Sequence, residues 1–172
     1  EEYDYSFEFE NSKFFGLPYE ENDMVSYEGV KEYINKITNF KPRDYQIEGI
    51  YDALRCNRRL IVSPTGSGKS LMIYALSRYH AEQNKKVLIV VPTTSLVEQM
   101  YKDFYEYGWD VKTNCHRIYA GKDLFSKAPV IISTWQSLYK QDKKWFRNFS
   151  CVIGDEAPVS YTHLRAHETL HN

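Results

Sequence analysis

Eight consecutive residues in the first half of the chain combine two glycines with a lysine and a serine. They follow the apolar run 60–62 and read Ser63-Pro64-Thr65-Gly66-Ser67-Gly68-Lys69-Ser70. Glycine permits backbone conformations that other residues avoid, so N–H groups from Thr65 to Gly68 can converge on an anion at the start of the next helix. Lys69 would contact the terminal phosphates of a nucleotide, and the Ser70 hydroxyl would be a ligand of a bridging magnesium ion. The segment predicts a phosphate-binding loop.

The alternative for this segment is an ordinary corner between a strand and a helix. Such a corner needs at most one glycine, and it gives no reason for a Lys-Ser pair in the first helical turn. Ser63 stands where the usual pattern has its first glycine. A small residue is what that position needs, so the phosphate-binding interpretation is favoured.

Two adjacent carboxylates, Asp155 and Glu156, follow the short apolar run 151–154. In open α/β sheets, ligands bind outside the carboxyl ends of the strands. A strand that ends near the phosphate loop would bring Asp155 to the magnesium ion and Glu156 to an attacking water. An acidic surface turn is the alternative, and the phosphate loop makes it the weaker one.

Two further segments carry weaker signals. Gln46 lies off the apolar stripe of a predicted helix, so the core does not require it, and its amide has the donor and acceptor that an adenine edge needs; a plain surface glutamine remains the alternative. Thr93, Thr94 and Ser95 begin another predicted helix and offer hydroxyls and N–H groups to a second phosphate. Ser95 and Glu98 have the spacing of a capping box, so these residues could equally serve only as a cap.

These residues need a parallel sheet to bring them together. Apolar runs at 60–62, 86–91, 130–133 and 151–154 predict its strands, and residues 115–119 read as a further, shorter strand. Apolar stripes predict helices that begin near Ser26, Pro42 and Ser95. Trp135 and Trp145 are better explained as core or interface aromatics than as platforms for bases. The sequence predicts an α/β fold.

Charge is divided unevenly along the chain. The first 30 residues contain nine acidic residues and one lysine, whereas the remainder has 21 basic and 14 acidic residues. Tyr3, Tyr5, Phe7 and Phe9 alternate with polar residues, as in a strand with one buried face. We interpret residues 1–40 as a short acidic α+β segment, the remnant of an accessory domain. The basic remainder can hold a polyanion, although such a surplus is also common on solvated surfaces.

Composition narrows the class of protein. With 42% apolar and 26% charged residues, and no apolar run near the roughly 18 residues of a membrane span, the sequence is typical of a globular cytoplasmic protein. Cys56, Cys115 and Cys151 are scattered and read as buried thiols of a reducing compartment. The first residue is Glu1 rather than methionine, which suggests a piece of a longer protein.

Taken together, residues 43–157 resemble the first RecA-like domain of superfamily-two nucleic-acid helicases. Residues 92–100 and 134–149 are most similar to the phage UvsW-type recombination and repair helicases. The motifs that carry the resemblance are Tyr45-Gln46, Pro64 to Ser70, Val91 to Gln99, Ser133 to Gln136 and Asp155-Glu156-Ala157.

The resemblance implies a RecA-like P-loop NTPase domain at 41–157, a mostly parallel sheet flanked by helices. It implies an ATP-dependent helicase that uses ATP and Mg²⁺ and acts on single-stranded or branched DNA, in the host cytoplasm if a phage encodes it. Lys69, Asp155 and Glu156 would be catalytic, and Ser70 and Asp155 would hold the metal. ATP would be bound by Gln46, Thr65, Gly66, Ser67, Gly68, Lys69 and Ser70. DNA would be bound by Pro92, Thr93, Thr94, Thr134 and Gln136.

The sequence departs from the family pattern in two places. The acidic motif should end in histidine or aspartate, whereas Pro158 stands there. The second RecA-like domain, which carries the arginine finger of the family, has no counterpart in the 172 residues. We therefore expect this chain by itself to be inactive as an ATPase. A restriction-type DNA translocase and a non-enzymatic nucleotide-binding module remain alternative functions.

The tail 158–172 contains His167-Glu168-Thr169-Leu170-His171, the spacing of a zinc-protease helix. A third ligand should follow, but only Asn172 does, and the three imidazoles that include His163 lack groups to orient them. The tail also resembles translated sequencing-adaptor read-through. We interpret it as non-native and disordered.

Deleting residues 158–172 should therefore leave the melting temperature unchanged within about 1–2 °C, because surface changes usually lie within about 0.5 kcal/mol. Thermal unfolding of both proteins measures this. A larger decrease would show that the tail is packed and native.

Overall fold

The computed structural model describes residues 21–56, 59–61, 63, 66–119 and 124–155. The chain divides into two compact units, Glu1–Leu76 and Ser77–Asn172. The boundary between them falls inside helix α3 (Lys69–Glu82). The predicted boundaries near residues 40 and 157 stay predictions, and the strand expected around Tyr3 to Phe9 lies outside the described residues.

The first unit contains helices α1 (Tyr27–Ile37) and α2 (Asp44–Arg55), which pack against each other. The α1 helix begins where predicted, because the Ser26 hydroxyl accepts a hydrogen bond from the Gly29 N–H. The α2 helix begins later than predicted, at Asp44 rather than at Pro42. Each helix turns an apolar stripe inward, and its buried residues are Val30, Ile34 and Ile37 in α1 and Ile47, Ile50 and Leu54 in α2.

The first half of α3 belongs to the same unit and is buried on all sides from Leu71 to Leu76. The fully buried Tyr74 hydroxyl donates a hydrogen bond to the Ile37 carbonyl at the end of α1, at 2.8 Å. The strand predicted at 60–62 is not seen: Leu60 and Ile61 are in no strand, and Val62 lies outside the described residues.

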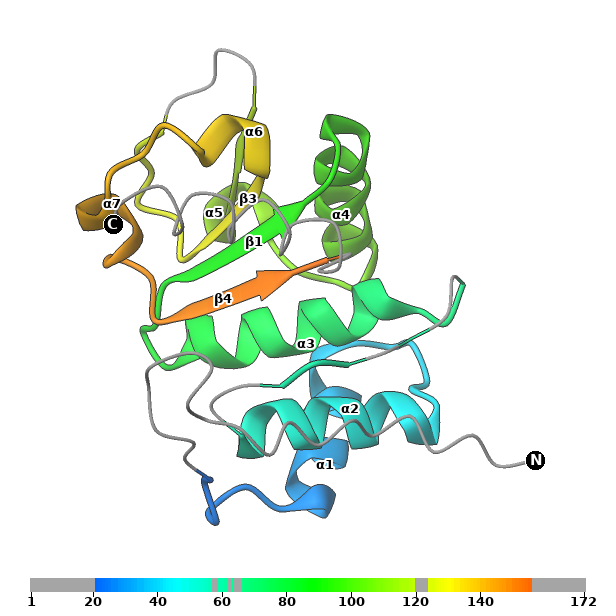
Figure 1. Ribbon diagram of the computed structural model, residues 1–172. Helices are drawn as coiled ribbons and strands as arrows, with labels where there is room; N and C mark the ends of the chain where they lie inside the picture. The colour runs from blue at the N-terminus through cyan, green and yellow to red at the C-terminus, as the bar shows by residue number, and fades with distance from the viewer. Residues whose placement is uncertain (1–20, 57–58, 62, 64–65, 120–123, 156–172) are drawn as a thin grey trace. The chain divides into compact units, whose positions relative to one another are not determined.

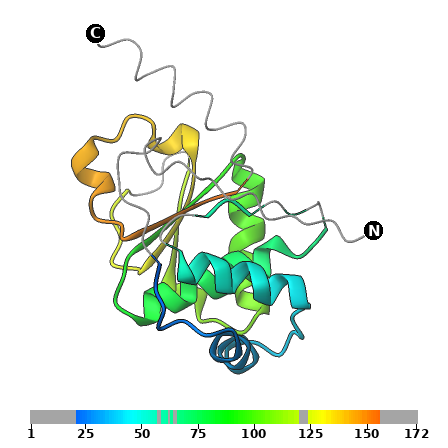
Figure 2. The same cartoon turned by 60° about the horizontal axis from the view of Figure 1, so that its bottom comes forward.

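In the described part of the second unit, four parallel strands form a sheet in the order β2-β3-β1-β4, of which Figure 1 labels β3, β1 and β4. Its strands are β1 (Val87–Val91), β2 (Cys115–Ile118), β3 (Val130–Thr134) and β4 (Cys151–Gly154). All four were predicted from the sequence. The β4 strand forms one edge of this sheet, and Figure 2 draws it in orange from another side.

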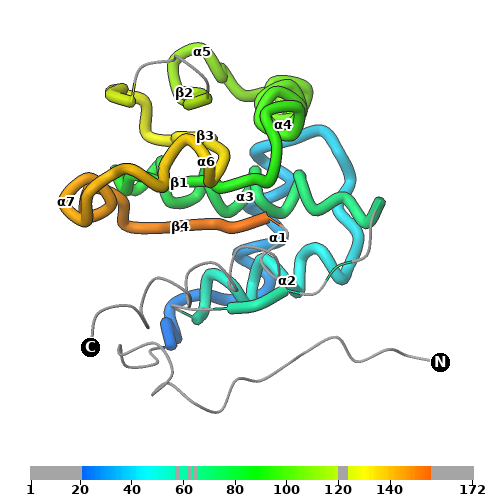
Figure 3. Tube along the Cα trace, turned by 45° about the horizontal axis from the view of Figure 1, so that its top comes forward, coloured from blue at the N-terminus to red at the C-terminus, as the bar shows by residue number. Residues whose placement is uncertain are grey.

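Helix α4 (Thr94–Glu106) follows β1 and packs on the sheet (Figure 3). It buries Val97, Met100 and Phe104, whereas Tyr105 is 67% exposed. The described residues of this unit also form three helices of one turn that were not predicted: α5 (Val111–Asn114), α6 (Trp135–Leu138) and α7 (Lys143–Phe146). No described helix has the length and apolar character of a membrane span.

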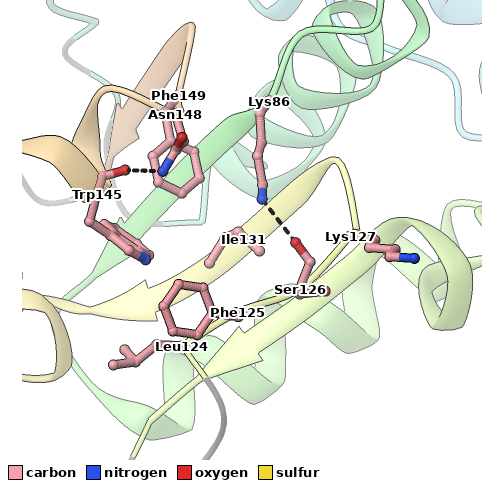
Figure 4. A pocket seen from close by; sticks show the side chains of 9 residues that line it. All are labelled: Lys86, Leu124, Phe125, Ser126, Lys127, Ile131, Trp145, Asn148 and Phe149. Atoms are coloured by element: carbon pink, nitrogen blue, oxygen red, sulfur yellow. Dashed lines mark hydrogen bonds between the residues drawn. The ribbon is translucent and has the colours of Figure 1, made fainter.

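Trp145 lies in the core of this unit, as predicted, with Leu88, Ile118, Ile131 and Leu138. It also borders a hollow of about 380 Å³ at the amino-terminal ends of the strands (Figure 4). There the Lys86 ammonium donates a hydrogen bond to the Ser126 carbonyl at 2.9 Å, and the Asn148 amide donates one to the Trp145 carbonyl. None of the predicted site residues lines this hollow.

Candidate functional site

The phosphate loop is described at Ser63 and from Gly66 onward, while Pro64 and Thr65 lie outside the described residues. Gly66 and Gly68 have φ angles of +80° and +78°, in the left-handed region that other residues rarely adopt. Lys69 and Ser70 then begin α3. The local geometry is the one that the sequence predicts: a glycine turn that leads into a helix N-terminus, where N–H groups lack partners within the helix.

Ser63 has a contact that glycine could not make. Its hydroxyl shares a short hydrogen bond with the hydroxyl of Ser67, which is buried. The two side chains link the beginning of the loop to its centre. The serine in place of the usual glycine is therefore compatible with the loop and also braces it.

Gln46 is only 5% exposed, so the prediction that it lies away from the packed interior was wrong. Its Nε2 donates hydrogen bonds to the carbonyl oxygens of Ser67 at 3.0 Å and Gly68 at 3.2 Å. Its Oε1 accepts one from the Arg43 N–H at 2.8 Å, which caps α2. The apolar stripe could not reveal this burial, because the amide is held by hydrogen bonds to a segment more than 20 residues away.

Tyr45 reaches the same loop from the same helical turn. Its hydroxyl donates a hydrogen bond to the Ser67 carbonyl at 2.6 Å, and it accepts one from the Arg43 guanidinium at 3.1 Å. The side chains of two adjacent residues thus hold one carbonyl oxygen of the phosphate loop. The sequence indicated Tyr45 only as part of the Tyr45-Gln46 motif, without a role for its hydroxyl.

In the second unit, the carboxyl ends of three strands bring predicted residues to one edge of the sheet. Because the strands are parallel, the ends of β1, β3 and β4 lie side by side, with Val91 opposite Thr134 and Val90 opposite Gly154. The Asp155 N–H donates a hydrogen bond to the Val90 carbonyl at 2.9 Å. Asp155 is therefore fixed next to the end of β1, while Glu156 lies outside the described residues.

The segment after β1 presents two exposed threonines at the start of α4. Thr93 caps the helix, since its hydroxyl accepts a hydrogen bond from the Leu96 N–H at 3.3 Å. The cap predicted at Ser95 was wrong because the helix begins one residue earlier than Ser95, at Thr94. Thr94 is exposed in the first helical turn, and Pro92 is half-buried.

The segment after β3 differs from the expectation for its threonine. Thr134 is 3% exposed, and its hydroxyl is hydrogen-bonded to the Ser137 hydroxyl at 2.9 Å. Gln136 is exposed at the second position of α6. Of this pair, Gln136 has the accessible side chain, and a contact from Thr134 would use its backbone.

Glu98 has partners that the sequence did not suggest. Its carboxylate accepts hydrogen bonds from Arg117 on β2 and from the Tyr119 hydroxyl, and the Arg117 guanidinium lies 3.9 Å from the centre of the Tyr101 ring. This group ties α4 to the sheet close to the threonines that begin the helix. Such pairing over about 20 residues has no local sequence signal.

The titratable groups with clearly shifted pKa values lie away from these segments. Burial raises the pKa of the Cys115 thiol to about 12 and that of Cys151 to about 11. Burial and the nearby Lys85 lower the pKa of His80, whose Nδ1 is buried without a hydrogen-bond partner. Thiols that stay protonated are poor nucleophiles, so neither cysteine is suited to covalent catalysis.

Among the described residues, no group of three or more His, Cys, Asp or Glu side chains could hold a metal ion. Magnesium does not need one, because it usually binds one or two protein oxygens together with substrate phosphates and water. The Ser70 hydroxyl and the Asp155 carboxylate are oxygen donors of that kind. The histidines of the tail 158–172 lie outside the described residues.

Comparison with known families gives a match over residues 39–166, to the family described as "Type III restriction enzyme, res subunit". The match includes every residue that was predicted to bind nucleotide, metal or DNA. It also extends beyond the acidic pair into the tail.

Individual relatives are DNA enzymes. The chain is 34% identical over 151 residues to the ATP-dependent DNA helicase uvsW of Enterobacteria phage T4, which covers 81% of this chain and 30% of the relative. It is 34% identical over 87 residues to the reverse gyrase of Pyrobaculum aerophilum, covering 51% of this chain and 7% of that enzyme. A crystal structure of the UvsW helicase from bacteriophage T4 matches with a TM-score of 0.72 and 34% identity, over 80% of this chain and 52% of that one. The chain thus spans under a third of the phage helicase's length.

Proposed function

The chain belongs to the family of the type III restriction enzyme res subunit, and we propose that it forms the first RecA-like motor domain of an ATP-dependent DNA helicase or translocase. The substrate that we propose is branched or recombination-intermediate DNA. A second RecA-like domain would complete the motor. A DNA motor of this kind would work in the cytoplasm, in that of the host cell if a phage encodes it.

The observation that carries this proposal is the phosphate loop. Two glycines with positive φ lead into Lys69 and Ser70 at the first turn of α3, and Gln46 holds the loop from behind. N–H groups at a helix N-terminus lack partners within the helix and favour an anion, and Lys69 adds a positive charge beside them. An ATP phosphate is an anion of that kind.

The residues would divide the work of phosphoryl transfer as follows. Lys69 would bind the terminal phosphates, Ser70 and Asp155 would hold Mg²⁺, and Glu156 would orient the attacking water. Bound Mg²⁺ would neutralise charge on the phosphate oxygens. Gln46 would read adenine through its Oε1, since an amide oxygen can accept a second hydrogen bond besides that from the Arg43 N–H.

The edge of the sheet in the second unit supports a DNA contact. Thr94 and Gln136 are exposed there, beside the start of α4, whose N–H groups favour a phosphate. Pro92 and Thr93 directly precede Thr94 in the segment after β1. Thr134 ends β3 and directly precedes α6, which carries Gln136. These contacts would go to the DNA backbone and so would not select a base sequence.

A restriction-type translocase is a second candidate, favoured by the description of the matching family. Its motor would use the same residues for ATP and DNA. The two candidates differ in the DNA structure that they prefer, which a binding experiment can measure.

We expect forked DNA to bind more tightly than blunt duplex of the same length, with a dissociation constant that rises steeply with salt. Each phosphate contact adds about 0.7–0.9 to the slope of log K against log salt. Fluorescence anisotropy with forked, single-stranded and blunt DNA at several salt concentrations measures this. Thr94→Ala should weaken binding by about two- to tenfold, the value of one hydrogen bond.

Thr113→Ala is the matched control, because Thr113 is an exposed threonine of the same unit on α5. It should leave DNA binding unchanged. Equal affinity for forked and blunt DNA would favour the restriction-type motor. Binding of ATP without any salt-dependent binding of DNA would reject both motors and leave a nucleotide-binding module.

A further inference from the structure

Tyr45 makes a contact that its packing does not explain. The residue is 41% exposed, yet its hydroxyl donates a 2.6 Å hydrogen bond to the Ser67 carbonyl in the phosphate loop. The Arg43 guanidinium donates to the same hydroxyl. An exposed ring gains little from burial, so the hydroxyl is the part of the side chain with a defined partner.

The carbonyls that Tyr45 and Gln46 hold belong to the peptide units that present the loop's N–H groups. A trans peptide is planar, and its C=O and N–H point in opposite directions. The Ser67 carbonyl shares its peptide with the Gly68 N–H, and the Gly68 carbonyl shares its peptide with the Lys69 N–H. Holding these two oxygens on the side of α2 turns the two N–H groups to the other side, away from the helix.

The Ser67 carbonyl is held more firmly than the Gly68 carbonyl by this helical turn. It accepts hydrogen bonds from both Tyr45 and Gln46. The Gly68 carbonyl accepts one from Gln46 and one from the Leu71 N–H in the first turn of α3. Two donors match the two lone pairs of a carbonyl oxygen. The orientation of the Gly68 N–H therefore depends on Tyr45 as well as on Gln46.

We infer that Tyr45 is a positioning residue for phosphate binding: its hydroxyl holds the Ser67–Gly68 peptide so that the Gly68 N–H faces the bound phosphate. The inference rests on the proposed function, since it needs a phosphate in the loop. Tyr45 touches neither the phosphate nor the base in this role. Its effect is on the loop before the nucleotide arrives.

The experiment is Tyr45→Phe, which keeps the ring and removes only the hydroxyl. Affinities for ATP and for inorganic tripolyphosphate are measured by competition with a fluorescent ATP analogue. We expect both to weaken together by about two- to tenfold, the range for one hydrogen bond, with their ratio unchanged because no base contact is lost. In the ligand-free protein, the amide ¹H–¹⁵N resonance of Gly68 should move, which a general loss of stability would not produce selectively.

Tyr51→Phe is the matched control, because Tyr51 lies on the same helix and packs edge-on against Tyr27. It should change neither affinity nor the Gly68 resonance. Unchanged tripolyphosphate affinity in Tyr45→Phe, or a loss confined to ATP, would overturn the inference while leaving the proposed function in place. Failure of the unsubstituted protein to bind either ligand would overturn both.

Discussion

Lys69→Ala should reduce ATP affinity on the order of 100-fold, the upper range for hydrogen bonds to a charged group. The lysine is half-buried at the first position of α3, directly after the left-handed Gly68. We expect Lys69 to lie at the phosphate site and not in the packed core, so its removal should leave the melting temperature nearly unchanged. Titration of a fluorescent ATP analogue and thermal unfolding of both proteins measure the two effects.

Lys31→Ala is the control, because Lys31 is an exposed lysine of the same unit on α1. It should retain full affinity for the nucleotide. If Lys69→Ala bound ATP as well as the unsubstituted protein, the loop would have to be removed from the proposed site. A large decrease in melting temperature would instead assign Lys69 a structural role.

Gly68→Ala should disrupt the loop more than Gly66→Ala, although both glycines have a positive φ. A left-handed conformation costs an alanine roughly 1–2 kcal/mol at either position. At Gly68 the new Cβ would clash with the Gln46 Nε2, whereas at Gly66 no described atom lies within 4 Å of the new Cβ. The Gly68 substitution therefore displaces the buried Gln46 amide as well, at a further cost of about 1–3 kcal/mol.

Urea unfolding and ATP titration of the two variants test this difference, and a double-mutant cycle identifies its source. In a Gln46→Ala background the amide is absent, so the cost of Gly68→Ala should fall to that of Gly66→Ala. Equal costs of the two substitutions in the unsubstituted protein would contradict the contact. A cost of Gly68→Ala that persists in the Gln46→Ala background would mean that backbone strain alone explains it.

Elements with strong local patterns could be predicted from the amino-acid sequence. Four of the five predicted strands became β1 to β4, whereas Leu60 and Ile61 of the fifth are in no strand; the glycine-rich turn became a loop with Lys69 and Ser70 at the start of a helix. Burial of short apolar runs and the conformational freedom of glycine are properties of a few neighbouring residues. The parallel direction of the strands followed from runs that are apolar on both faces.

Features that depend on partners far apart in the sequence became apparent only in the folded structure. The apolar stripe of α2 predicted that Gln46 lies outside the packed interior. In the structure, a loop carbonyl about 20 residues away accepts a hydrogen bond from its side-chain amide, and Gln46 is buried. The N-cap of α4 is Thr93 instead of the predicted Ser95. Glu98 accepts hydrogen bonds from Arg117 and Tyr119, which lie about 20 residues later in the sequence. A polar side chain forms a hydrogen bond only when the folded backbone places a partner within about 3 Å. The sequence of a single helix gives no information on which distant groups come that close.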